Sequence, residues 1–304
     1  MSRPTRWTVA LDETEAAWNS LGWVETVVRD ADSVRLVTVH EQLGESRERS
    51  TGRLTIATHL LRDRHPHLEV AHEVVSGPTV ARLVTDAVDG DVLVVGGRHS
   101  DRLWACLTGR VTERVVAHVT TPVVVVPERW RPGRDEDAVV VGVDGGTAAS
   151  ALAVGAVLAE GRRDGLVLVR AWRSIPDGGP FRDATAVHGR AMSEHDGQLE
   201  LDAAIRWVSR VHPDLRMRAE LRQGTPSEAL ARAGRTTALI VVGRRHRTAV
   251  GAFLGGSVGE ALVHRSSTPL CVVPQSSVPP VGAPTAPPAR TTWNRPAIAD
   301  PSVS

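Results

Sequence analysis

A stretch from Gly243 to Ser257 contains the residue types that can hold a phosphate group. Gly243 follows an apolar run typical of a buried strand, and a residue without a side chain lets the backbone approach a ligand closely. Gly256 and Ser257 stand where a helix is predicted to begin, so free backbone N–H groups would face a phosphate. Ser257 can also offer its hydroxyl. The same residues are compatible with a plain turn and a helix cap, and residue types alone leave both readings open.

Charged side chains surround this stretch. Arg244, Arg245 and Arg247 bring positive charge close to the predicted phosphate site. Asp144 follows another apolar run, and its carboxylate can accept a hydrogen bond from an adenine amino group or a ribose hydroxyl. We therefore expect Asp144 to lie across a crevice from Gly243.

Other chemistries have less support in the sequence. All 36 basic residues are arginine, so the lysine of a P-loop is missing. His65, His67 and His72 have no acidic or cysteine partner nearby, and we predict surface histidines rather than a metal site. The carboxylates, Asp144 included, have no paired acid or base that the sequence places beside them. We therefore predict no catalytic residues and no enzyme, with slow, incidental hydrolysis of a bound phosphate compound left open.

The chain contains an internal repeat. Residues 121–128 (TPVVVVPE) and 268–275 (TPLCVVPQ) lie 147 positions apart, and the same offset aligns VVGGRH with VVGRRH. The front parts align at an offset near 132, which indicates an insertion in the second copy, predicted as a loop over residues 175–189. The repeat predicts domains at residues 5–127 and 138–275, a linker at 128–137 and a disordered Pro-rich tail at 276–304.

Each copy alternates short apolar strands with helical segments, a pattern typical of a parallel sheet covered by helices. We predict an α/β fold of two tandem five-stranded, mostly parallel sheets with helices on both faces. The predicted strands of the second copy are 139–143, 166–172, 215–221, 239–242 and 269–273, and the predicted helices are 148–162, 194–211, one opening at 225–228, and 257–265. Ligands of such sheets bind beyond the carboxyl ends of the strands. Asp144, Ala171 and Gly243 should therefore converge.

With these motifs the sequence resembles the universal stress proteins. Their nucleotide-binding members carry Gly, two residues, Gly, nine residues, Gly, then Ser or Thr, after a strand. The spacing here is the same, from Gly243 through His246 to Gly256 and Ser257, with His246 at the middle glycine. The Asp144 strand end, the second strand ending in Ala171 and the final TPLCVVP strand match as well.

The resemblance implies that the second copy binds ATP or AMP, with Mg²⁺ accompanying a triphosphate. Asp144 and the backbone near Ala171 would meet the adenine. The residues along the ribose and phosphates would be Gly243, His246, Gly256, Ser257 and Val258. We expect an ATP-binding, non-catalytic stress-response or signalling protein; the alternatives are a nucleotide-free interaction module and a weak ATPase.

The first copy departs from this pattern at three matching positions. Arg110 takes the place of Ser257, Glu13 that of Gly145, and Trp18 that of Ser150. We predict that the first copy does not bind nucleotide and has a structural or regulatory role.

Composition limits the partners. The net charge of +1 gives no reason to expect a nucleic-acid partner. The sequence contains no run of 18 apolar residues, so no membrane span is predicted. Cys106 and Cys271 lack a CxxC partner, which favours reduced thiols and a cytoplasmic protein. A signalling role would also involve a protein partner, whose identity the sequence leaves open. The resemblance implies antiparallel pairing of the last strands, 123–126 and 270–273, as an intramolecular pseudo-dimer. A further homodimer stays open.

Overall fold

The computed structural model describes residues 4–40, 46–97, 109–132, 137–145, 149–173, 194–244, 258, 262 and 266–275. The first half contains β1 (Arg6–Ala10), α1 (Glu15–Val27), β2 (Ser33–His40), α2 (Arg47–Arg64), β3 (Glu69–Ser76), α3 (Thr79–Ala87), β4 (Val92–Gly97), α4 (Gly109–His118) and β5 (Val123–Pro127). The second half contains β6 (Val139–Val143), α5 (Ala149–Ala159), β7 (Leu166–Trp172), α6 (Glu194–Val211), β8 (Met217–Gln223), α7 (Pro226–Gly234), β9 (Leu239–Gly243) and β10 (Leu270–Val273).

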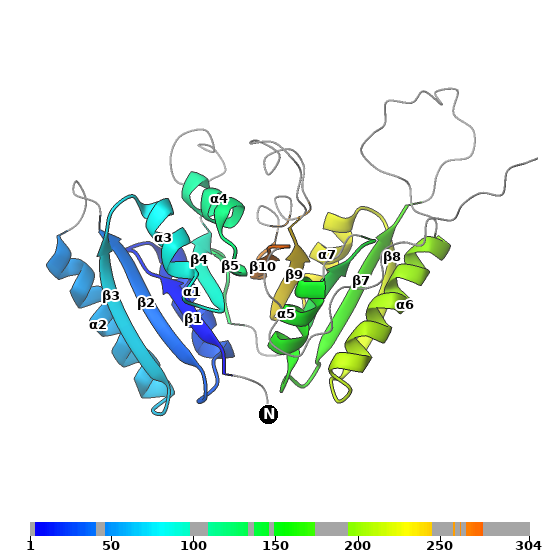
Figure 1. Cartoon of the computed structure of the whole chain (residues 1–304), viewed down its shortest axis with the longest axis horizontal. Coiled ribbons are helices and arrows are strands. Elements are labelled where there is room, and N and C mark those ends of the chain that lie inside the picture. Colours follow the sequence, from blue (N-terminus) through cyan, green and yellow to red (C-terminus); the bar gives the residue numbers. More distant parts are fainter. Residues whose placement is uncertain are drawn as a thin grey trace, which may run out of the picture.

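The α/β fold of two tandem five-stranded units is confirmed. Within each half the strands are parallel, in the orders β3-β2-β1-β4-β5 and β8-β7-β6-β9-β10. The last strands of the two halves pair antiparallel, with Cys271 opposite Val124, so the two predicted sheets form one ten-stranded sheet. Figure 1 shows the halves side by side with β5 and β10 at the centre.

Helices cover both faces of this sheet. On one face, α1, α2, α5 and α6 pack over a core cluster to which both halves contribute. On the other face, α3, α4 and α7 pack over a second cluster, again shared by both halves. The four consecutive valines of β5 are all buried, as expected for a strand with side chains packed on both faces. The core therefore runs through the junction without a break.

Local signals set several element boundaries. The capping box of Thr225 and Glu228 starts α7 where the sequence predicts it. The helix predicted over 148–162 ends at Ala159, because Gly161 adopts a left-handed φ of 80° that terminates it. The strand predicted over 215–221 is Met217–Gln223, because it pairs residue for residue with β7. The predicted loop at 175–189 and the tail at 276–304 lie outside the described residues.

The start of the predicted linker packs on the first half. Trp130 is buried in the core cluster under α1, and the Asn19 amide donates to the Glu128 carbonyl at 2.6 Å. Arg131 forms a 2.9 Å ion pair with Glu15 at the start of α1. A further contact joins the halves directly, since the Trp23 indole N–H donates to the Ala238 carbonyl at 3.4 Å. The described residues at the start of the predicted linker are therefore held against α1 by these contacts.

Candidate functional site

The carboxyl ends of three neighbouring strands bring the sequence-predicted residues together. Asp144 follows β6, Ala171 lies near the end of β7, and Gly243 ends β9. β6 lies between the other two strands, and neighbouring strands are about 4.8 Å apart. The chain leaves β6 on the β7 side and returns on the β9 side, so the order of strands reverses here. In α/β sheets this switch point is where a ligand crevice forms.

The end of β6 is held from β7 by a buried arginine. The Arg170 guanidinium donates to the Val143 carbonyl at 3.2 Å, directly before Asp144. The same guanidinium lies 2.8 Å from the Glu200 carboxylate on α6, forming an ion pair that is largely buried. These contacts fix the backbone from which the Asp144 carboxylate projects.

No role is predicted for Arg170 from the sequence, because residues 166–172 match the pattern of an apolar strand. A charge inside an otherwise apolar strand, with Glu200 on the following helix, was the available signal. The first half has the same contact with a different side chain: the buried Thr38 hydroxyl donates to the Leu11 carbonyl at 2.6 Å, directly before Asp12. Both halves thus fix the carbonyl that precedes the strand-end aspartate.

Two equivalent glycines differ in the space around them. Gly243 and Gly96 occupy the same position in the repeat, each near the end of the fourth strand of its half. A Cβ atom added to Gly96 would lie 2.6 Å from the Ala16 carbonyl carbon and 2.8 Å from the Ala17 nitrogen. A Cβ atom at Gly243 would meet only the Ala151 methyl, at 3.7 Å, among the described residues. The start of α1 therefore covers the strand end in the first half. Residue 148, the counterpart of Ala16 in the second half, lies outside the described residues.

The strand-end aspartate of the first half bonds to its own turn. The Asp12 carboxylate accepts from the Thr14 backbone N–H at 2.9 Å, and the Thr14 side chain caps α1 through the Ala17 N–H. Trp18 packs partly buried against the core cluster. Its counterpart Ser150 is buried, and its hydroxyl donates to the Pro274 carbonyl at 3.4 Å. Ser150, which the motif match included, thus bonds to the residue after β10.

The remaining predicted site residues divide into two groups. Arg245, His246, Gly256 and Ser257 lie outside the described residues, as does Arg247. Val258 is helical and packs, partly buried, against the core cluster beneath α4 and α7.

Arg244 corrects an expectation. Its guanidinium donates to the Val116 carbonyl of α4 in the first half, rather than adding charge to a phosphate site. Burial lowers the pKa of Arg244.

No group of three metal-binding side chains occurs in the part of the chain that the structure describes. His65 bonds to the Glu25 carbonyl at 3.0 Å, and His72 bonds to the Thr58 hydroxyl at 3.0 Å. Cys271 is fully buried, as expected of a small apolar residue, and burial raises the pKa of its thiol to about 12. Cys106 lies outside the described residues. None of the described helices has the length and apolar character needed to cross a membrane.

A cleft of about 240 Å³ lies at the seam between the halves, away from the strand ends described above. Its lining includes Trp7 and Trp23 from the first half and Arg162 and Leu239 from the second. The two indole rings meet edge to face, 5.9 Å apart. Arg162 lies 3.5 Å from Asp137, and burial lowers the pKa of the arginine. Because β9 begins at Leu239, this cleft is at the amino end of the strands.

The strand order, the switch point and the repeated half define a tandem, doubly wound α/β protein. The sequence matches the universal stress protein family over residues 6–127 and again over residues 137–274, so the chain belongs to that family.

Individual relatives agree with this assignment. The chain is 30% identical over 221 residues to universal stress protein Rv1996 of Mycobacterium tuberculosis, covering 70% of this chain and 68% of the relative. It is 29% identical over 210 residues to universal stress protein Rv2623 of the same organism, covering 68% and 69%. The crystal structure of a universal stress protein from Archaeoglobus fulgidus aligns with a TM-score of 0.63 at 15% identity, covering 89% of this chain and 96% of that one. At 15% identity, this structural similarity supports the fold alone.

Proposed function

We propose that the second half binds ATP, accompanied by Mg²⁺, at the carboxyl ends of β9, β6 and β7, and that the first half binds none. The observation that carries this proposal is the convergence of Asp144, Ala171 and Gly243 at the carboxyl ends of neighbouring strands. In the first half the start of α1 lies against Gly96 at backbone distance, which leaves no space for a ligand at that strand end. A crevice at a switch point of strand order supports the same assignment.

Each site residue has a role in this proposal. The Asp144 carboxylate accepts a hydrogen bond from the adenine amino group or a ribose hydroxyl, and the backbone near Ala171 borders the adenine. Gly243 lets the ligand approach the end of β9. The phosphate side of the proposed site consists of Arg245, His246, Gly256, Ser257 and Val258.

The proposed output is a signal rather than a chemical product. We assign no catalytic step to the crevice. Nucleotide occupancy would alter a surface that a partner protein reads, in the cytoplasm, where ATP is available. A turnover assay tests this part: steady release of phosphate that Asp144→Ala abolishes would replace it with a weak ATPase.

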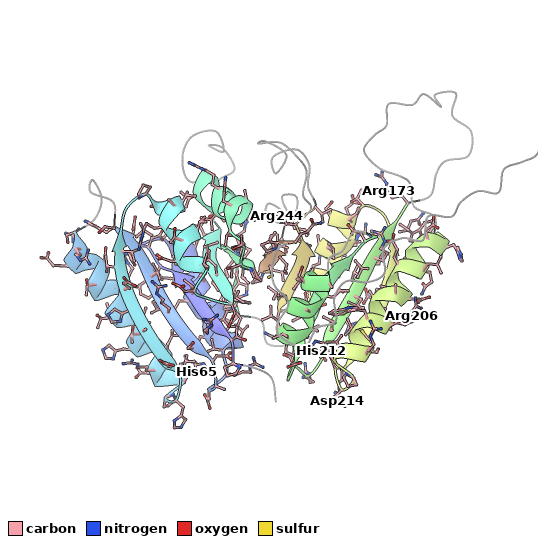
Figure 2. All side chains as sticks on the ribbon, viewed as in Figure 1. His65, Arg173, Arg206, His212, Asp214 and Arg244 are labelled. Atoms are coloured by element: carbon pink, nitrogen blue, oxygen red, sulfur yellow. The ribbon has the colours of Figure 1, made fainter. Side chains whose placement is uncertain are left out.

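Calorimetry with the full chain tests the binding. We expect Mg-ATP to bind with a dissociation constant below about 1 mM. Ser257→Arg, which imitates Arg110 of the first half, should abolish binding and leave the circular dichroism spectrum unchanged. Asp144→Ala should weaken binding, while Asp214→Ala serves as the matched control because Asp214 is exposed beyond α6, as labelled in Figure 2. Absence of binding by the unaltered chain at millimolar ATP would refute the proposal.

A further inference from the structure

The residue after β9 joins the two halves of the molecule. The Arg244 backbone N–H donates to the Val273 carbonyl of β10 at 2.8 Å, so the main chain directly after Gly243 is anchored to the strand at the junction. The Arg244 side chain continues across the junction and donates to the Val116 carbonyl of α4. Figure 2 shows Arg244 between α4 and the second half.

The acceptor suits a cation. Val116 lies in the last turn of α4, which ends at His118, and carbonyls in the last turn of a helix lack helical N–H donors. The carboxyl end of a helix also carries partial negative charge, which favours a guanidinium there. No described carboxylate lies within ion-pair distance of Arg244. The helix end is therefore its main described electrostatic partner.

At the matching position of the first half, the residue that would make this contact in the opposite direction has no side chain. In the repeat, Gly97 of the first half occupies the position of Arg244. Gly97 has no side chain, and a Cβ atom there would lie 2.7 Å from a Val125 methyl group. The first half therefore holds the end of β9 in the second half, whereas Gly97 cannot hold the second half in return.

We propose that Arg244 is a positioning residue through which α4 of the first half fixes the end of β9 beside the nucleotide crevice. The proposal rests on the function proposed above and assigns a task to the half that binds no nucleotide: it holds one wall of its neighbour's site. Because coupling between two sites is reciprocal, ATP bound beside Gly243 should in turn stabilise the last turn of α4.

Hydrogen exchange and calorimetry on the full chain test this. Arg244→Gly imitates the first half, Arg244→Lys restores a cation without the planar fork, and Arg206→Ala is the control on the exposed side of α6 (Figure 2). Without nucleotide, Arg244→Gly should speed exchange both at α4 and at β9. It should weaken Mg-ATP binding by about five- to tenfold, with partial recovery in Arg244→Lys. ATP should slow exchange at α4 in the unaltered chain and not in Arg244→Gly.

The outcomes separate the two proposals. If the unaltered chain binds no ATP, the proposed function fails, and the exchange measured without nucleotide still decides whether Arg244 fixes β9. If exchange at β9 in Arg244→Gly equals that of the unaltered chain, the inference is overturned whatever ATP does. If ATP binds the unaltered chain and Arg244→Gly equally well, the positioning role is overturned. Should Arg244→Gly fail to fold, the same comparisons are made with Arg244→Gln, which removes the charge and keeps most of the side chain.

Discussion

Adding one methyl group at each of two equivalent glycines should have opposite consequences in the two halves. In Gly96→Ala the new Cβ would lie 2.6 Å from the Ala16 carbonyl carbon and 2.8 Å from the carbonyl oxygen. Carbon atoms in contact are normally about 3.5–4.0 Å apart, so β4 and the start of α1 must separate by about 1 Å. Both sides of this contact are main chain, and neither can rotate away. We expect a loss of about 3 kcal/mol, the upper end of the usual cost of overpacking.

In Gly243→Ala the new Cβ meets the Ala151 methyl at 3.7 Å, an ordinary contact distance. Its backbone φ is outside the left-handed region, so the backbone accepts alanine, and the contact with Ala151 is the one found among the described residues. Replacing glycine reduces the conformational freedom of the unfolded chain, and a gain of about 0.5 kcal/mol is expected. If ATP approaches the end of β9, the methyl group stands in its path. We expect at least about tenfold weaker binding, which corresponds to 1.4 kcal/mol.

Two measurements on each variant test this reasoning. Thermal unfolding should shift down by about 6 °C in Gly96→Ala and hardly change in Gly243→Ala. Calorimetry with Mg-ATP should show weaker binding in Gly243→Ala and, measured well below its melting temperature, unchanged binding in Gly96→Ala. Equal thermal shifts in the two variants would show that α1 and α5 do not differ in the way described. Unchanged ATP affinity in Gly243→Ala would place the ligand elsewhere.

Two further predictions concern the interior of the molecule. Glu200→Ala removes the buried partner of Arg170 and should lower the free energy of unfolding by about 3 kcal/mol. Glu220→Ala, in the partly exposed pairs of β8, should cost at most about 1 kcal/mol. If urea denaturation showed equal losses in the free energy of unfolding for the two variants, this reasoning would be wrong. The double variant Arg170→Met with Glu200→Leu should recover most of the free energy lost in Glu200→Ala. In a Cys106→Ser background, Cys271 should resist thiol reagents at pH 8 until the chain unfolds, because its buried thiol has a pKa of about 12. Since that pKa is raised on folding, the stability contributed by the neutral thiol is complete below about pH 8.5 and falls by about 1.4 kcal/mol per unit towards pH 12; Cys271→Ala should remove this slope.

Much of the fold follows from the sequence. The apolar strands are local patterns, because burial on both faces of a parallel sheet requires continuous apolar side chains. The repeat is visible from the constant offset in the later part of each copy. These patterns predict the strand ends that carry Asp144, Ala171 and Gly243. The structure brings these ends together because β6 lies between β7 and β9.

Tertiary structure decided the features that depend on which surfaces meet. Gly96 and Gly243 are the same residue in the same motif, and only the tertiary structure shows that the start of α1 packs against Gly96 at backbone distance. Arg170 could not be assigned from its own strand, because its partners Val143 and Glu200 come from another strand and a later helix. Arg244 looked like part of a basic loop, yet the junction places the end of α4 within its reach. Sequence specifies the residues and their periodicity, whereas the direction of a long side chain is set by the acceptors that folding places around it.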